Sequence, residues 1–109
     1  MPVNEQKLID FVGKAVGDAG AAVSASLVVI GDKLGLYKAL AANGPLTSAE
    51  LAKETGTAER YVREWLCNQA AGGYVAYDAD AGKFFLPEEQ AVALADESSP
   101  FFLPGRSSA

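Results

Sequence analysis

Four polar side chains on one predicted helix, over residues 58–71, are of the types that proteins use to read DNA bases. They are Arg60, Arg63, Asn68 and Gln69. In the major groove, arginine pairs with guanine, and asparagine or glutamine pairs with adenine. Together with Lys83, which follows in a predicted hairpin, they define a DNA-binding interpretation of the sequence.

The surrounding charges argue against that interpretation. Each of the two arginines has an acidic residue four positions away on the same helix, Glu59 or Glu64. The predicted wing, where basic side chains would contact phosphates, carries Asp78 and Asp80. The whole chain has a net charge of −5 at pH 7. A small winged-helix transcription regulator that binds DNA is therefore the alternative function, and the sequence favours a protein without a nucleic-acid partner.

Catalytic chemistry has little support in the composition. The chain contains no histidine and one cysteine, Cys67. This excludes imidazole acid–base catalysis, histidine-dependent triads, and zinc sites built from imidazoles or several thiolates. The neighbouring carboxylate of Glu64 disfavours a reactive Cys67 thiolate. No glycine-rich phosphate-binding motif occurs. We predict no catalytic, cofactor-binding or metal-binding residues in this chain.

The residues discussed so far lie within a segment, 46–86, that has the layout of a winged helix-turn-helix. Thr47 and Glu50 form a capping box, which predicts the start of the first helix. Gly56 permits a tight turn after that helix. Thr57 is placed to cap the second helix.

The second helix presents one broad inward face, because inward residues recur at spacings of three and four. They are Ala58, Tyr61, Val62, Trp65, Leu66 and Gln69. The β-prone runs 74–77 and 83–86, joined by a turn rich in aspartate and glycine, predict the hairpin of the wing. Leu46 is placed to add a short strand to it.

Before this segment, residues 5–34 keep a helical spacing of apolar residues, beginning after the N-cap candidate Asn4. Glycines weaken this helix, and they predict a break near Gly17, with Asp18 capping a second helix. Small residues over 17–26, followed by large apolar ones, favour close packing against a second copy of the chain. The predicted dimer interface is Val16, Val23, Leu27 and Ile30. The alternative is an ordinary core helix packed on the winged helix.

The predicted fold is mainly α, a winged helix-turn-helix with an N-terminal helical extension and a small β-hairpin wing. At 109 residues, the chain forms a single domain over 1–97, followed by a linker over 98–109 toward a further domain that this sequence lacks. The domain divides into a helical dimerisation extension, 1–45, and the winged helix-turn-helix, 46–97. No apolar run reaches the roughly 18 residues needed to cross a membrane, and no targeting pattern occurs. The sequence predicts a cytoplasmic protein.

Several segments resemble the N-terminal winged-helix domain of class I S-adenosylmethionine-dependent methyltransferases of the actinobacterial, small-molecule type. These segments are 31–40, 51–52, 57–66, 69–75 and 85–87. The resemblance extends over about residues 5–100. It implies that the domain mediates dimerisation and closes over the substrate, while a following Rossmann-like domain binds the cofactor. This sequence has no strand followed by a glycine-rich turn, so no cofactor-binding or catalytic residue is carried over to it.

The predicted function is therefore that of a non-catalytic dimerisation and substrate-cap domain of a methyltransferase that acts on a small molecule. The resemblance implies S-adenosylmethionine as the cofactor of the parent enzyme, and a small-molecule substrate in the full-length protein. The predicted partner of this chain is a second copy, with no nucleic acid and no membrane. A further alternative is a free-standing dimer module that pairs with a full-length relative.

Overall fold

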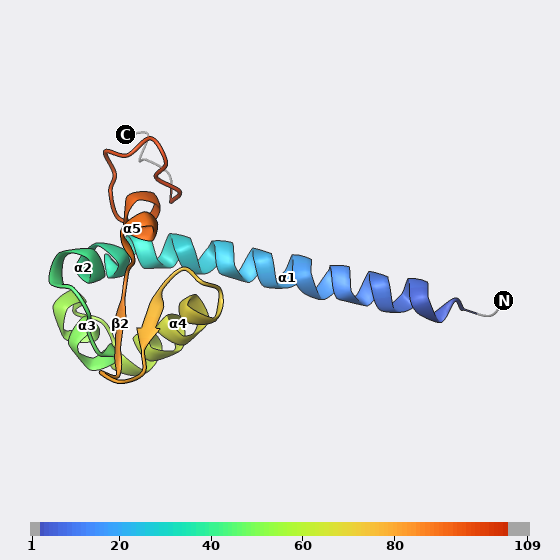
Figure 1. The fold of residues 1–109 in the computed structure, drawn as a ribbon, viewed down its shortest axis with the longest axis horizontal. Helices are drawn as coiled ribbons and strands as arrows, with labels where there is room; N and C mark the ends of the chain where they lie inside the picture. Colours follow the sequence, from blue (N-terminus) through green and yellow to red (C-terminus); the bar gives the residue numbers. More distant parts are fainter. Residues whose placement is uncertain (1–2, 105–109) are drawn as a thin grey trace.

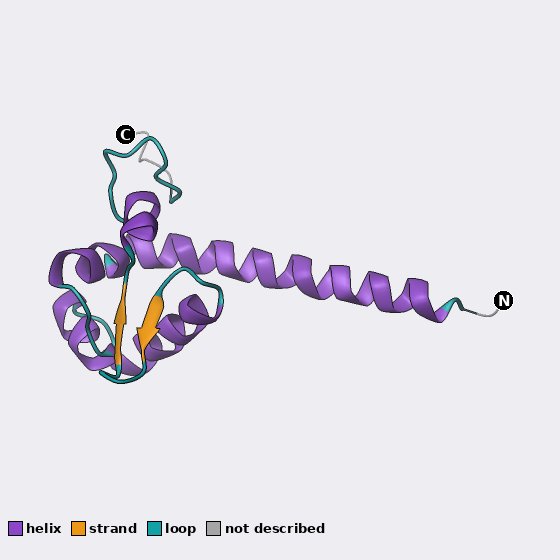
Figure 2. Ribbon diagram, viewed as in Figure 1, coloured by secondary structure: helices purple, strands orange, loops and turns teal. Residues whose placement is uncertain are grey.

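The computed structural model describes residues 3–104, without the side chains at positions 16 and 19–24. A long first helix projects from a small body formed by the remaining helices and one hairpin (Figures 1 and 2). The mainly α, winged helix-turn-helix fold predicted from the sequence is confirmed. In the described part, no helix is long and apolar enough to span a membrane. The elements are α1 (Glu5–Lys33), α2 (Leu36–Asn43), α3 (Ser48–Thr55), α4 (Glu59–Ala71), β1 (Ala76–Asp78), β2 (Lys83–Phe85) and α5 (Glu88–Leu94).

Helix α1 is continuous over 29 residues, so the predicted break near Gly17 was wrong. Glycine costs about 1 kcal/mol relative to alanine in a helix, but unlike proline it removes no hydrogen bond and causes no clash. Asp18 does not cap a second helix; its carboxylate instead pairs with Lys14, at 2.6 Å. The predicted N-cap is confirmed, because the Asn4 side chain accepts a hydrogen bond from the backbone N–H of Lys7.

The capping box of α3 forms as predicted. The Thr47 hydroxyl accepts from the Glu50 backbone N–H at 3.1 Å, and the Glu50 carboxylate accepts from the Thr47 N–H at 2.8 Å. These hydrogen bonds from Thr47 lower the pKa of the Glu50 carboxyl. Gly56 ends α3 in the left-handed conformation, with φ of 66°.

The predicted cap of α4 was wrong. The N-cap residue is Ala58, whose side chain has no capping atom, and not Thr57. The Thr57 hydroxyl lies 2.8 Å from the Thr55 hydroxyl, which also donates to the backbone carbonyl of Leu51. The Thr57 hydroxyl, which the sequence pattern assigned to the cap of α4, therefore interacts with the last turn of α3 instead.

The wing is a two-stranded antiparallel hairpin, in which Tyr77 lies opposite Phe84. Leu46 adds an isolated bridge to Phe84, as predicted, through a pair of backbone hydrogen bonds of 2.9 and 2.8 Å. The chain thus enters α3 from a third short extended segment beside the hairpin. This pairing holds the wing against the first helix of the helix-turn-helix.

The core lies where α2, α3 and α4 meet. Tyr61, which the sequence pattern placed inward, is 44% exposed, and Ala58 is exposed as well, so both placements were wrong. The buried face of α4 is narrower than the pattern suggested and leaves Tyr61 at its edge. The core side chains with the least exposure are Leu36, Tyr37, Leu40, Leu51, Val62, Leu66 and Leu94.

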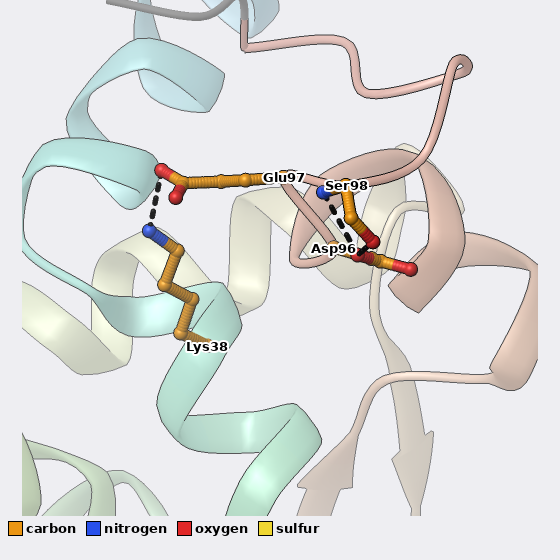
Figure 3. Close-up of polar contacts among 4 residues, drawn as sticks. All are labelled: Lys38, Asp96, Glu97 and Ser98. Atoms are coloured by element: carbon orange, nitrogen blue, oxygen red, sulfur yellow. Dashed lines mark hydrogen bonds and ion pairs between the residues drawn. The ribbon is translucent and has the colours of Figure 1, made fainter.

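After α5, the chain turns back against the body. The Asp96 carboxylate accepts from the backbone N–H and the hydroxyl of Ser98, at 3.0 and 2.5 Å (Figure 3). Lys38 on α2 pairs with Glu97 at 2.8 Å, and this contact raises the pKa of the Lys38 amine. Leu103 then donates its backbone N–H to the carbonyl of Ala93. The described part of the predicted linker therefore contacts the domain; positions 105–109 lie outside the described residues.

One glycine sets how closely α1 approaches the body. A Cβ on Gly31 would lie 2.4 Å from Cζ2 of Trp65 and 2.8 Å from Cε2 of Tyr37. These two rings pack edge to face, with centroids 5.0 Å apart. Because both rings are buried in the core, neither can move aside cheaply.

We expect Gly31→Ala to destabilise the protein, whereas Gly13→Ala, with nothing within 4 Å of its Cβ, stabilises it. Overpacking at position 31 costs about 1–3 kcal/mol, and the higher helix propensity of alanine offsets up to about 1 kcal/mol of that cost. Urea unfolding, followed by Trp65 fluorescence at equal protein concentration, should give a free energy of unfolding lower by about 1–2 kcal/mol for Gly31→Ala. Wild-type stability in Gly31→Ala would contradict the close approach of α1.

Candidate functional site

The projecting half of α1 exposes large apolar side chains. Leu8 is 51% exposed, Phe11 67% and Val12 50%, and they recur at helical spacing. We call these three residues the α1 stripe. Ile9, beside them, is 63% exposed. Monomeric proteins rarely leave a contiguous apolar patch uncovered, so the α1 stripe is a candidate interaction surface.

The α1 stripe faces away from the chain's own core. Val28 and Gly31, near the other end of α1, are buried against the body. At about 100° of rotation per residue, Leu8 and Val28 point roughly 160° apart around the helix. While α1 is continuous, the body therefore cannot cover the stripe. Figure 1 shows the same arrangement, with the first turns of α1 far from every other element.

The predicted dimer interface lies closer to the body than this stripe. Leu27 and Ile30 are half-buried, and Leu27 packs against the chain's own core. The Leu27 carbonyl also accepts a 2.9 Å hydrogen bond from the Trp65 indole. Val16 and Val23 have side chains outside the described residues. Sequence reasoning did not assign the α1 stripe to an interface, although the four-residue spacing of its apolar side chains indicated one face.

The predicted DNA-reading residues do not form one surface. Arg60, Arg63 and Asn68 are exposed on α4, as expected. Gln69 is 1% exposed, and its side-chain carbonyl accepts a hydrogen bond from the Tyr37 hydroxyl. The assignment of Gln69 to a DNA-binding surface was therefore wrong. The sequence placed Gln69 beside Asn68 on the predicted DNA-reading surface and also on the inward face of α4. Packing against α2 buries it on the inward face.

The basic side chains near α4 have acidic neighbours. Nε of Arg63 lies 3.7 Å from the Glu59 carboxylate, as the four-residue spacing predicted. Lys83, the basic residue of the wing, lies 3.9 Å from the carboxylate of Glu50. The Asp78 carboxylate accepts two backbone N–H groups in the hairpin turn, so the wing tip presents negative charge. Among the described residues, Arg60 forms no ion pair, so the pairing with Glu64 that the spacing predicted does not form. Phosphate binding needs several cations free of acidic neighbours, and the carboxylates beside Arg63 and Lys83 disfavour it here.

The hydrogen bond between Tyr37 and Gln69 joins α2 to α4 inside the core. Burial raises the pKa of the Tyr37 phenol, and the nearby Tyr74 and Asp32 raise it further. The phenol therefore remains a protonated donor at neutral pH. Within the described residues, Nε2 of Gln69 and Oδ1 of Asp32 are buried without a hydrogen-bond partner. This cluster orients two helices, and we assign it a structural role.

The arrangement of α3, α4 and the hairpin defines a winged helix-turn-helix domain. Residues 21–96 match the family described as the Rv2258c-like winged HTH domain. Since this match spans well over half of the sequence, the chain belongs to that family. No curated protein matches the chain significantly.

Solved structures with this fold include enzymes. CalO1, a methyltransferase in calicheamicin biosynthesis solved in its SAH-bound form, matches 92% of this chain at 27% identity and a TM-score of 0.63. PigF, solved with SAH, matches 94% at 20% identity and a TM-score of 0.72. RosA, the N,N-8-amino-8-demethyl-D-riboflavin dimethyltransferase of Streptomyces davawensis, matches 90% at 23% identity and a TM-score of 0.58.

These likenesses confirm the resemblance to methyltransferases that the sequence indicated. For PigF and RosA, the low identity establishes a shared fold alone. This chain spans 27% of the length of each of the three solved chains. The winged-helix domain is thus the part that is compared, and the activity of a whole enzyme is a separate question.

The acidic neighbours of Arg63 and Lys83 give a prediction about DNA. We expect no tight binding of a duplex oligonucleotide by fluorescence anisotropy at about 50 mM salt, and no change in the double variant Arg60→Ala/Arg63→Ala. The opposite result would be an affinity that falls steeply toward about 200 mM salt and is lost in the double variant. That result would establish the DNA-binding alternative.

Proposed function

We propose that this chain is the dimerisation and substrate-cap domain of a S-adenosylmethionine-dependent methyltransferase that acts on a small molecule, and that it performs no catalysis itself. The observation that carries this proposal is the match to CalO1, which extends over 92% of the chain at 27% identity. A winged helix supports many functions, so the fold alone would not be sufficient.

Homodimerisation is supported by the α1 stripe. A symmetric dimer places the same patch of both copies in contact, so an exposed apolar stripe on a projecting helix is a suitable element. Each stripe needs a surface outside its own body, because Leu8 and Val28 lie on opposite sides of α1. A second copy brings an equivalent apolar stripe without requiring any other component.

The role as a substrate cap is supported by the comparison with CalO1. The chain spans 27% of the length of CalO1, which was solved with SAH. We assign the cofactor and the methyl-transfer chemistry to the remainder of such an enzyme. A small domain beside that chemistry would contribute by covering the substrate and excluding water.

The dimer is tested by adding charge to the α1 stripe. Light scattering at low micromolar concentration should give twice the 11.3 kDa chain mass for the wild type. In Leu8→Glu/Val12→Glu, buried carboxylates oppose association, and the expected mass is that of a monomer. Gly13→Glu/Gly17→Glu is the matched control, because it adds the same charge at the same spacing on the opposite face, and it should remain a dimer. A monomeric wild type would refute homodimerisation by this chain.

The absence of a cofactor site in this chain is tested separately. Isothermal titration with S-adenosylmethionine, and then with SAH, should give no saturable heat, because the chain has no glycine-rich turn after a strand. Titration of the ligands into buffer provides the dilution control. Saturable binding at a stoichiometry of about one per chain would show that the winged-helix domain itself holds the cofactor.

A further inference from the structure

A groove lies between α4 and the wing, on the side of α4 that faces the hairpin. Its volume is about 550 Å³, within the range of roughly 300–1,000 Å³ typical of small-molecule sites. One wall is formed by Arg63, Cys67 and Ala70, which recur on one face of α4. The other wall contains Tyr77 and Phe84. We call this the α4–wing groove.

The wing supplies an aromatic wall. Tyr77 and Phe84 are directly opposite in the hairpin, so their side chains share one face of it. Their ring centroids lie 4.7 Å apart, with a tilt of 45° between the rings. Phe84 is buried, whereas Tyr77 is 52% exposed and leaves the groove open on its side. A flat apolar molecule can stack or pack edge-on against such a pair.

Arg63 is the charged side chain among the residues that line the groove. Its contact with Glu59 runs through Nε at 3.7 Å, which is longer than a hydrogen bond, and its side chain is 60% exposed. Such an exposed pair contributes little energy and is readily exchanged. Of the two hydroxyls at the groove mouth, Ser48 donates to Glu59, whereas Thr47 accepts the hydrogen bond that caps α3. Arg63 is therefore the cationic group of the lining that can bind a negative charge.

We propose that the α4–wing groove binds a small planar aromatic monocarboxylate. The ring packs against Tyr77 and Phe84, and the carboxylate takes charge-assisted hydrogen bonds from the Arg63 guanidinium. This site goes beyond the proposed function. The site is built entirely from described residues of this chain. The turn of the hairpin that borders the groove lies at the end of β2 that is away from α5 (Figure 1). Methyl transfer and dimerisation are not needed for it.

The probe for this site is 2-naphthoate, titrated into the isotopically labelled chain and followed by two-dimensional NMR. We expect saturable shifts of backbone amides around the groove, at Ser48, Arg63, Cys67 and Gly82. Arg63→Met keeps the aliphatic stem and removes the charge, and it should weaken binding roughly tenfold or more. Arg60→Met is the matched control, an exposed arginine on α4 outside the groove lining, and it should leave the affinity unchanged.

The uncharged analogue 2-naphthylmethanol separates the carboxylate from the ring. We expect it to bind at least about tenfold more weakly than 2-naphthoate to the wild type, and equally to the wild type and Arg63→Met. Unsaturable shifts, or shifts centred on other elements, would overturn the proposal. Equal loss of 2-naphthoate affinity in Arg60→Met and Arg63→Met would also overturn it, because it would show a general attraction to positive charge. None of these outcomes depends on the oligomeric state or on S-adenosylmethionine.

Discussion

The contact between Gly31 and the rings of Trp65 and Tyr37 determines how α1 lies on the body of the domain. A residue without a side chain lets α1 lie against these rings, where any Cβ would overlap them. Four residues earlier, the Leu27 carbonyl accepts the indole N–H of Trp65, which leaves the buried indole nitrogen with a partner. Two anchors one helical turn apart fix both the direction of α1 and its rotation. The orientation of the α1 stripe follows from them.

The length of α1 raises the question of what stabilises the part of this helix that projects from the body. Isolated helices are marginal in water even for good sequences, and most helical stability in proteins comes from packing one face. Gly13 and Gly17 lower the helix propensity further in the part that projects from the body. The large side chains that the structure describes in this part, such as Leu8 and Phe11, remain exposed. Packing of the α1 stripe against a partner would supply the missing stabilisation.

The features that the sequence predicted correctly depend on a few neighbouring residues. The capping box needs Thr47 and Glu50 at one spacing, and the cap at Asn4 needs one side chain before a helical run. The incorrect predictions depended on tertiary contacts. Gln69 lies in the middle of the buried face of α4, and only its polar side chain suggested a contact with DNA. Tyr61 lies at the edge of that face and remains exposed. The α4–wing groove joins residues 47 to 84, and its shape depends on how the hairpin packs against the helices, which local spacing does not specify.

Helix α4 presents three faces, and they separate the possible interactions of this domain. One face, with Val62 and Leu66, is buried in the core. Arg63 and its neighbours face the wing across the α4–wing groove. The third face, with Tyr61, borders Leu27 where α1 leaves the body. A partner on the α1 stripe and a small ligand beside the wing would therefore occupy separate surfaces of the domain. The two can be occupied together, because the first turns of α1 lie far from α4 and the hairpin (Figure 1).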